Sequence, residues 1–265
     1  MDIADKLDIA GVAGQADAAN TVDTADMANT ADTVDTADTM DAELAGLLAE
    51  MKAYGEANHV PIINARGLQV LTEAVAKKKP RRVLEIGTAI GYSALYIAAN
   101  AAADARIITL ELSDERADQA EAFIARSRFA RQIEVVRGDA GENILKQSGS
   151  FDLVFIDAAK GQYPDYFRKV CPLLAEDGVV IADNVLFRGY VQGTEPVPRR
   201  FRTIVKRLRE YIGMVTKNEA FKTEIHADGD GLAVSWRQVK GVKDGLEDGR
   251  AAGYLAARID GGTDR

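Results

Sequence analysis

The sequence has few residues of the kinds that build covalent cross-links or soft-metal sites. Its 265 residues include one cysteine, Cys171, so no disulfide can form within the chain. Two histidines, His59 and His226, are too few for a His-rich centre, so any metal would take oxygen ligands. No apolar run approaches the ~20 residues of a membrane span, and the first residues lack the pattern of a signal peptide. We therefore expect a cytoplasmic protein that makes no contact with a membrane.

Charge is distributed unevenly along the chain. The formal net charge is −8, and residues 1–40 alone carry nine aspartates and a single basic residue, Lys6. The remainder, 41–265, holds 32 basic and 32 acidic residues, so overall acidity does not exclude a nucleic-acid partner. We expect residues 1–40 to be a low-complexity acidic segment, disordered or weakly helical, with a short docking helix as the alternative. An ordered domain is expected over 41–237, and a mobile tail over 238–265.

Short runs rich in Val, Ile and Leu alternate with segments of helical spacing. The runs are RRVLEIG, ARIITLEL, QIEVVRGD, FDLVFIDA and GVVIADN. Near-continuous apolar strands that alternate with helices predict a parallel α/β sheet covered by helices on both faces. The later stretch FKTEIHADGDGLAVSWR predicts two antiparallel strands around a Gly-rich turn, which makes seven strands in all.

Acidic residues stand where each of the five predicted parallel strands ends. They are Glu85, Glu111, Asp139, Asp157 and Asp183, the last followed by Asn184. Ligands of open parallel sheets bind at this edge, so these side chains predict one binding site.

The stretch EIGTAIGYS, residues 85–93, predicts a nucleoside site without a pyrophosphate. It lacks the G-x-G-x-x-G pattern, although Gly87 and Gly91 still permit a tight turn, and Ser93 opens the next helix. Glu111 could accept hydrogen bonds from two ribose hydroxyls. S-adenosylmethionine (SAM) fits this combination, and a dehydrogenase-like domain with a degenerate glycine loop is the alternative.

A second group of residues has the chemistry of a metal site with a neighbouring base. Asp157, Asp183 and Asn184 offer three hard oxygen ligands of the kind that Mg²⁺ or another divalent cation accepts. The alternative is that these residues cap a turn and a helix. Lys160 follows Asp157 by three positions, and a nearby cation would lower its pKa and make it a proton acceptor. Alternatively, Lys160 is a surface residue paired with Asp157 or Asp165.

The helix predicted from PRRFRTIVKRLREYI is strongly basic on its exposed faces. Its basic residues and one in the preceding loop are candidate RNA contacts: Arg188, Arg199, Arg200, Arg202, Lys206 and Arg207. A solvated helix face is the alternative. Phe187 and Tyr190 in the loop could stack on a splayed base or belong to the core.

Taken together, EIGTAIGYSA, TLEL, GDA, FIDAAKGQY and ADNVLFRG resemble the metal-dependent O-methyltransferases of the catechol and caffeoyl-CoA type, from about Leu44 to Ser235. The resemblance implies a Rossmann-like SAM-methyltransferase fold and a homodimer. It also implies metal ligands Asp157, Asp183 and Asn184, with Lys160 and Asp157 as catalytic residues. The implied SAM contacts are Ile63, Glu85, Gly87, Ser93, Glu111, Asp139, Ala140 and Asp157.

Within that family, HVPII, the basic helix and GDGLAVS are most similar to the bacterial tRNA 5-hydroxyuridine methyltransferases. This implies a tRNA partner and formation of 5-methoxyuridine at the wobble position. The first alternative is methylation of a small catechol or caffeoyl-type substrate. The second is a non-catalytic SAM- or RNA-binding protein on the same fold.

Overall fold

The computed structural model describes residues 28–193, 196–227 and 229–239. The chain divides into two units, residues 1–43 and 44–265, and the second contains the sheet. Helix α1 (Ala28–Ala57) includes residues 28–40 of the acidic low-complexity segment. Residues 1–27 and nearly all of the predicted tail lie outside the described residues. Among the described helices, none is long and apolar enough to cross a membrane.

Seven strands form one sheet in the order β3-β2-β1-β4-β5-β7-β6. The strands are β1 (Arg82–Ile86), β2 (Arg106–Glu111), β3 (Ile133–Arg137), β4 (Phe151–Ile156), β5 (Leu174–Ala182), β6 (Phe221–His226) and β7 (Leu232–Arg237). Strands β1 to β5 are parallel, and β7 pairs antiparallel with both β5 and β6. This confirms the predicted mostly parallel seven-stranded sheet with its C-terminal hairpin.

The helices begin where the local sequence supplies a cap or a left-handed residue. Asn64 caps α2 (Ala65–Lys78) by accepting a hydrogen bond from Gly67 N, as its position before a helical pattern predicts. Gly91, at φ 84°, precedes α3 (Tyr92–Asn100). Ser113 and Asp139 cap α4 (Asp114–Ala125) and α5 (Ala140–Leu145). Next in the chain come η1 (Lys160–Gln162), α6 (Tyr163–Val170), η2 (Cys171–Leu173), η3 (Arg199–Phe201) and α7 (Arg202–Thr216).

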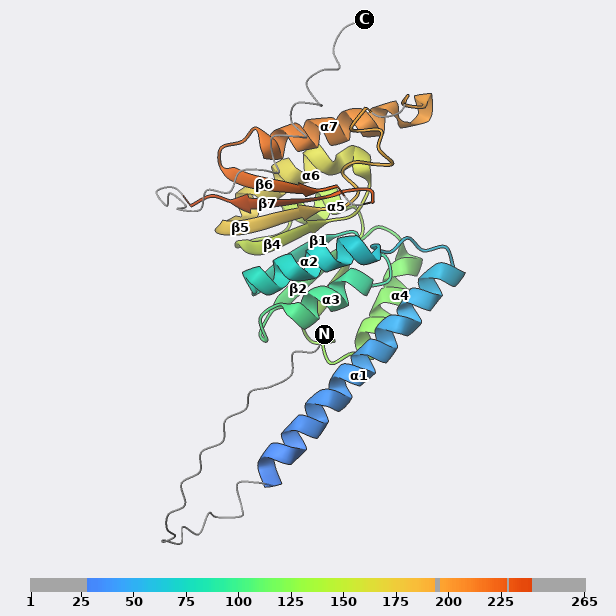
Figure 1. Cartoon of the computed structure of the whole chain (residues 1–265), viewed down its shortest axis with the longest axis vertical. Helices are drawn as coiled ribbons and strands as arrows, with labels where there is room; N and C mark the ends of the chain where they lie inside the picture. Colours follow the sequence, from blue (N-terminus) through green and yellow to red (C-terminus); the bar gives the residue numbers. More distant parts are fainter. Residues whose placement is uncertain (1–27, 194–195, 228, 240–265) are drawn as a thin grey trace, which may run out of the picture. The chain divides into compact units, whose positions relative to one another are not determined.

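Helices cover both faces of the sheet (Figure 1), and the sheet lies between two separate hydrophobic cores. One core joins the sheet to α2, α3, α4 and the part of α1 from Leu44 onward. The other joins it to α5, α6 and α7, whose side chains Val205, Leu208 and Ile212 are buried, as the amphipathic pattern predicts. Helices on both faces leave the carboxyl ends of the parallel strands as the accessible edge. Because β7 runs antiparallel to β5, the β6–β7 turn lies at that same edge.

Candidate active site

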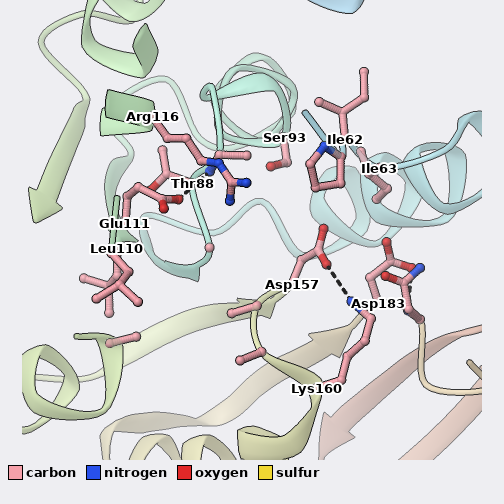
Figure 2. Close-up of a pocket in the computed structure, with 18 of the residues that line it drawn as sticks. Ile62, Ile63, Thr88, Ser93, Leu110, Glu111, Arg116, Asp157, Lys160 and Asp183 are labelled. Carbon is pink, nitrogen blue, oxygen red and sulfur yellow. Dashed lines mark hydrogen bonds and ion pairs between the residues drawn. The ribbon is translucent and has the colours of Figure 1, made fainter. Parts of the chain in front are cut away.

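A cavity of about 580 Å³ opens at the carboxyl edge of the sheet. It brings together most of the side chains that the strand ends predicted: Ile63, Gly87, Ser93, Glu111, Asp139, Ala140, Asp157, Lys160, Asp183 and Asn184. Figure 2 shows Thr88, Glu111 and Arg116 at one end of the cavity and Asp157, Lys160 and Asp183 at the other. We call these the Glu111 end and the Lys160 end, and count Asn184 with the latter.

The Glu111 end is built mainly from backbone. Gly87, at φ 103°, passes so close to β4 that a Cβ atom there would lie 2.1 Å from the Asp157 carbonyl oxygen. The N–H groups of Gly87 and Thr88 both donate to Leu110 O, which joins the glycine loop to the end of β2. The Glu111 carboxylate accepts from Ala89 N at 2.8 Å and from Ser113 N at 3.0 Å. A carboxylate held this way keeps acceptor capacity for a ligand's hydroxyl groups.

Glu85 lies below the cavity wall and does not line it. Its side chain is fully buried and accepts hydrogen bonds from Ser93 Oγ at 2.5 Å and Thr109 Oγ1 at 2.6 Å. Burial raises the pKa of Glu85 to about 7, although these two hydroxyl donors oppose the rise. The structure therefore places Glu85 as a support for Ser93, which reaches the cavity.

At the Lys160 end, the backbone N–H groups of Asp157 and Asp183 continue the hydrogen-bond ladder of the sheet. Asp157 N donates to Ile86 O at 2.9 Å, and Asp183 N donates to Ile156 O at 3.0 Å. Lys160 Nζ lies 3.8 Å from Asp157 Oδ1, an ion pair too long for a hydrogen bond. Asn184 adopts a left-handed conformation with φ 54°, and its N–H donates to Asp183 Oδ1 at 2.7 Å.

Negative charge is only partly compensated at the Lys160 end. Burial raises the pKa of Asp157, and the Lys160 ammonium opposes that rise. Burial, followed by the charge of Asp157, raises the pKa of Asp183 to about 7, and the Asn184 N–H and Lys160 act against it. Two carboxylates thus face one ammonium in a largely desolvated position.

The donor set at this end fits a hard divalent cation. Within the described part of the chain, no three His, Cys, Asp or Glu side chains gather as a metal cluster. Asp157 and Asp183 with the Asn184 amide nevertheless supply three oxygen-bearing side chains in one cavity. Mg²⁺ is bound by one or two carboxylates, with waters and substrate oxygens completing its octahedron. The residues present therefore fit such an ion.

The β6–β7 turn fixes the loop that follows these residues. The Asp230 carbonyl accepts from Leu186 N at 2.8 Å, and Asp230 Oδ1 accepts from Arg188 N at 3.0 Å. Gly231, at φ 77°, packs so tightly that a Cβ there would lie 2.3 Å from Leu186 Cγ. Asp230 lines the cavity and was missed from the sequence. The predicted antiparallel hairpin could have indicated it, because antiparallel pairing of β7 with β5 places the β6–β7 turn at the edge where ligands bind.

Aromatic rings and arginines form a rim cluster beside the Lys160 end, made of Phe187, Arg188, Tyr190, Arg200 and Phe201. Phe187 packs edge-on against Phe201 at 5.3 Å between ring centroids, and Tyr190 lies 5.8 Å from the same ring. The Arg188 and Arg200 guanidinium groups lie over Phe201 at 5.7 and 4.6 Å. Phe187 and Arg188 both have positive φ, at 41° and 57°, which is a strained conformation for such residues.

The predicted RNA contacts do not share one environment. Arg199, Arg202 and Lys206 are exposed on η3 and α7. Arg207 pairs with Glu210 at 2.9 Å. Arg209, also on the basic helix, donates to the Tyr190 and Val191 carbonyls and so anchors the loop. The exposed charges therefore continue outward from the rim cluster along η3 and the start of α7.

Other cavity residues were not anticipated from the sequence. They include Thr88, Leu112, Arg116 and Tyr166, together with Asp230. Leu112 is 72% exposed, which is unusual for a large apolar side chain, and it follows Glu111 directly. The predicted strand end therefore marked the right place, but it did not say which neighbours turn into the cavity.

The seven-stranded sheet and its helices form a Rossmann-like methyltransferase fold, with a cavity at the carboxyl ends of the parallel strands. The sequence profile of the O-methyltransferase family matches residues 36–238. The chain belongs to this family of SAM-dependent O-methyltransferases.

Curated relatives of the catechol type are similar over part of their length. The chain is 34% identical over 145 residues to the catechol O-methyltransferase of Mycobacterium tuberculosis, a match that spans 54% of this chain and 66% of that protein. It is 33% identical over 175 residues to the catechol O-methyltransferase of Niastella koreensis, over 60% of this chain and 77% of that one.

Solved structures of the same fold include one with the demethylated cofactor bound. A putative caffeoyl-CoA O-methyltransferase from Staphylococcus aureus superposes with TM-score 0.66 and 31% identity, over 72% of this chain and 92% of that one. An O-methyltransferase from Bacillus cereus in complex with SAH gives TM-score 0.64 and 26% identity, over 73% and 91%. These likenesses support SAM as the cofactor.

Proposed function

We propose that this chain transfers the methyl group of SAM to one of two adjacent oxygens on a planar ring, as in a catechol or caffeoyl-type substrate. One observation carries the proposal. The oxygen donors Asp157, Asp183 and Asn184 share a single cavity with the Lys160 ammonium and with Glu111. A nucleoside acceptor at one end and a cation cradle with a base at the other are what metal-assisted methyl transfer from SAM requires.

In the proposed methyl transfer, each polar residue of the cavity has a separate role. Glu111 accepts hydrogen bonds from the ribose hydroxyls, and Ser93, held by Glu85, bounds the cavity near the strand ends. Asp157, Asp183 and Asn184 would hold a divalent cation, and such an ion would lower the pKa of a substrate hydroxyl. Lys160 is the candidate general base for the proton of that hydroxyl. The oxygen then forms a bond to the methyl carbon as the S–CH₃ bond breaks, which leaves SAH.

The catechol relatives favour a small substrate, and the rim cluster supports a second candidate, 5-hydroxyuridine in tRNA. In 5-hydroxyuridine the hydroxyl stands beside the C4 carbonyl, so its two oxygens can hold one cation as those of a catechol do. Arg188 and Arg200 lie over Phe201 in the rim cluster, and the exposed Arg199, Arg202 and Lys206 are close to Arg200 in the sequence. Basic side chains next to aromatic rings suit an RNA strand.

Parallel methylation assays separate the two candidates. The purified protein is incubated with SAM and Mg²⁺, either with catechol and a caffeoyl ester or with tRNA that carries 5-hydroxyuridine. We expect EDTA-sensitive methylation of the small substrate, detected by mass spectrometry. A gain of one methyl on 5-hydroxyuridine, with catechol unchanged, would instead establish the tRNA activity. If SAH binds but neither substrate is methylated, the enzymatic proposal fails and a binding protein remains.

A double substitution in the rim cluster tests the same choice independently. For the tRNA candidate, Arg188→Gln with Arg200→Gln should weaken tRNA binding and reduce the slope of log affinity against log salt by about 0.7–0.9 per lost phosphate contact. Catechol turnover should stay within about twofold, because both side chains lie outside the cavity lining. An unchanged salt slope would remove the rim cluster from the argument.

A further inference from the structure

Tyr163, the first residue of α6, is fully buried at the point where β4 and β5 end. Its hydroxyl donates to the Asp183 carbonyl at 2.9 Å and lies 3.3 Å from the Ile156 carbonyl. Ile156 immediately precedes Asp157. One phenol therefore contacts the backbone beside both carboxylates of the Lys160 end.

The bond to Asp183 fixes the peptide that joins two of the proposed metal ligands. The carbonyl of that peptide accepts from Tyr163, and its N–H, which belongs to Asn184, donates to Asp183 Oδ1 at 2.7 Å. Both polar groups of the peptide are thus engaged, and Asn184 is held with its φ at 54°. Rotation of this peptide would move the Asp183 carboxylate and the Asn184 amide together.

The Ile156 carbonyl ties the second carboxylate to the same point. It accepts from Asp183 N at 3.0 Å, and the N–H of the same peptide, Asp157 N, donates to Ile86 O. The Tyr163 ring is itself held edge-on against Tyr211 of α7, with 5.7 Å between ring centroids. A rigid ring therefore backs the hydroxyl.

We propose that Tyr163 is a positioning residue that sets the spacing between Asp157 and the Asp183–Asn184 pair through its hydroxyl, without touching cation or substrate itself. The inference rests on the proposed function, because it requires that Asp157, Asp183 and Asn184 bind a cation. Partners outside the coordination sphere orient metal ligands in this way, and their loss costs about 10–100-fold in metal affinity or activity.

Tyr211 provides a matched control. It is also a fully buried tyrosine and packs on Tyr163, but its hydroxyl makes no hydrogen bond to the backbone of the proposed metal ligands in the described part of the chain. Tyr163→Phe and Tyr211→Phe therefore delete the same atom from neighbouring rings. Only the first deletion removes a bond to the ligand backbone.

The test measures Mn²⁺ affinity and SAH affinity separately by calorimetry on the full chain, and then turnover against Mn²⁺ concentration. For Tyr163→Phe we expect Mn²⁺ to bind about tenfold more weakly. Its SAH affinity should stay within about twofold and its turnover should recover at saturating Mn²⁺, because Glu111 and the cradle side chains remain. Tyr211→Phe should leave both affinities unchanged.

Several outcomes overturn the inference. Unchanged Mn²⁺ affinity in Tyr163→Phe would remove the positioning role, even if turnover fell. A joint loss of Mn²⁺ and SAH affinity would indicate general damage to the fold and would also overturn it, as would equal effects of the two substitutions. A wild-type protein that binds SAH but no Mn²⁺ would overturn the proposed cation site as well, which distinguishes the two failures.

Discussion

At the Glu111 end, one carboxylate accepts hydrogen bonds from two backbone N–H groups. At the Lys160 end, the Lys160 ammonium lies 3.8 Å from the Asp157 carboxylate, and the Asp183 carboxylate accepts from one backbone N–H. The negative charge of Glu111 is stabilised by these two N–H groups, so this end needs no added cation. The Lys160 end keeps carboxylates whose pKa is raised by burial, and at Asp183 also by mutual repulsion. Under the proposed function, the comparison teaches that the nucleoside half of the site is complete in the chain, while the acceptor half would need an added cation to balance its carboxylates.

The strongest way to break this comparison is to remove a ligand from the Lys160 end. Asp157→Ala should lower kcat/KM by more than about 100-fold, because even partners outside the coordination sphere cost about 10–100-fold. Metal dependence should disappear with it. Activity is measured by SAH release with and without EDTA. Asp165→Ala is the control, since Asp165 pairs with Lys169 on α6 outside the cavity lining. Near-wild-type, EDTA-sensitive turnover in Asp157→Ala would refute the metal site.

Lys160→Met separates proton transfer from cation binding at the same end. Loss of a general base costs about 10²–10⁴-fold in rate, so kcat should fall by this order while SAH and Mn²⁺ still bind. The matched change is Lys169→Met, which removes an ammonium that is also paired with a carboxylate. Single-turnover rates give the measurement. Equal kcat values for the two variants would exclude Lys160 as the base.

Glu111→Gln probes the other end. Hydrogen bonds to a charged group contribute about 1.5–3 kcal/mol, so the Kd for SAH should rise by about 10- to 100-fold. Mn²⁺ affinity should not change, because the two ends hold their ligands independently. Calorimetry measures both constants, with Glu115→Gln, an exposed residue in the first turn of α4, as control. Weaker Mn²⁺ binding in Glu111→Gln would show that the ends are not separate.

The last prediction concerns stability and comes from Glu85. Its folded-state pKa of about 7 exceeds the ordinary 4.5, so the folded chain keeps a proton that the unfolded chain releases between these values. The free energy of unfolding should therefore fall from about pH 4.5 to 7, by about 3 kcal/mol from this group. The wild-type profile also contains contributions from Asp157 and Asp183. Urea unfolding of wild type and Glu85→Gln at pH 5 to 8 isolates Glu85, and parallel profiles would contradict the assignment.

The sequence predicted the sheet and the edge at which the site lies, because apolar runs, helical spacing and strand-end acids are local patterns. The family resemblance in the sequence implied that Glu85 and Ser93 each contact the cofactor. Glu85 lies one residue before the end of β1, and side chains alternate between faces of a strand, so it turns toward α3 and meets Ser93 instead of the cavity. Glu111 is the last residue of its strand and lines the cavity.

The features that sequence could not predict depend on contacts between distant segments. The hydroxyl of Tyr163 meets the Asp183 carbonyl only after β4 and β5 have paired. The positive φ angles of Phe187 and Arg188 have no compositional signature, because neither residue favours that region. The packing of Phe187 and Tyr190 on Phe201 is likewise a contact that forms between the loop and η3 only in the folded chain.

The crossing of Gly87 over the Asp157 carbonyl bears on how this enzyme could be redesigned. A side chain at position 87 would push the glycine loop away from the end of β4. Under the proposed function, this would also move the methyl donor away from the acceptor. The distance between methyl donor and acceptor would then depend on the contact of Gly87 with the Asp157 carbonyl, which leaves no room for an added atom. Redesign for a new acceptor would therefore have to leave Gly87 unchanged and alter other residues of the cavity lining.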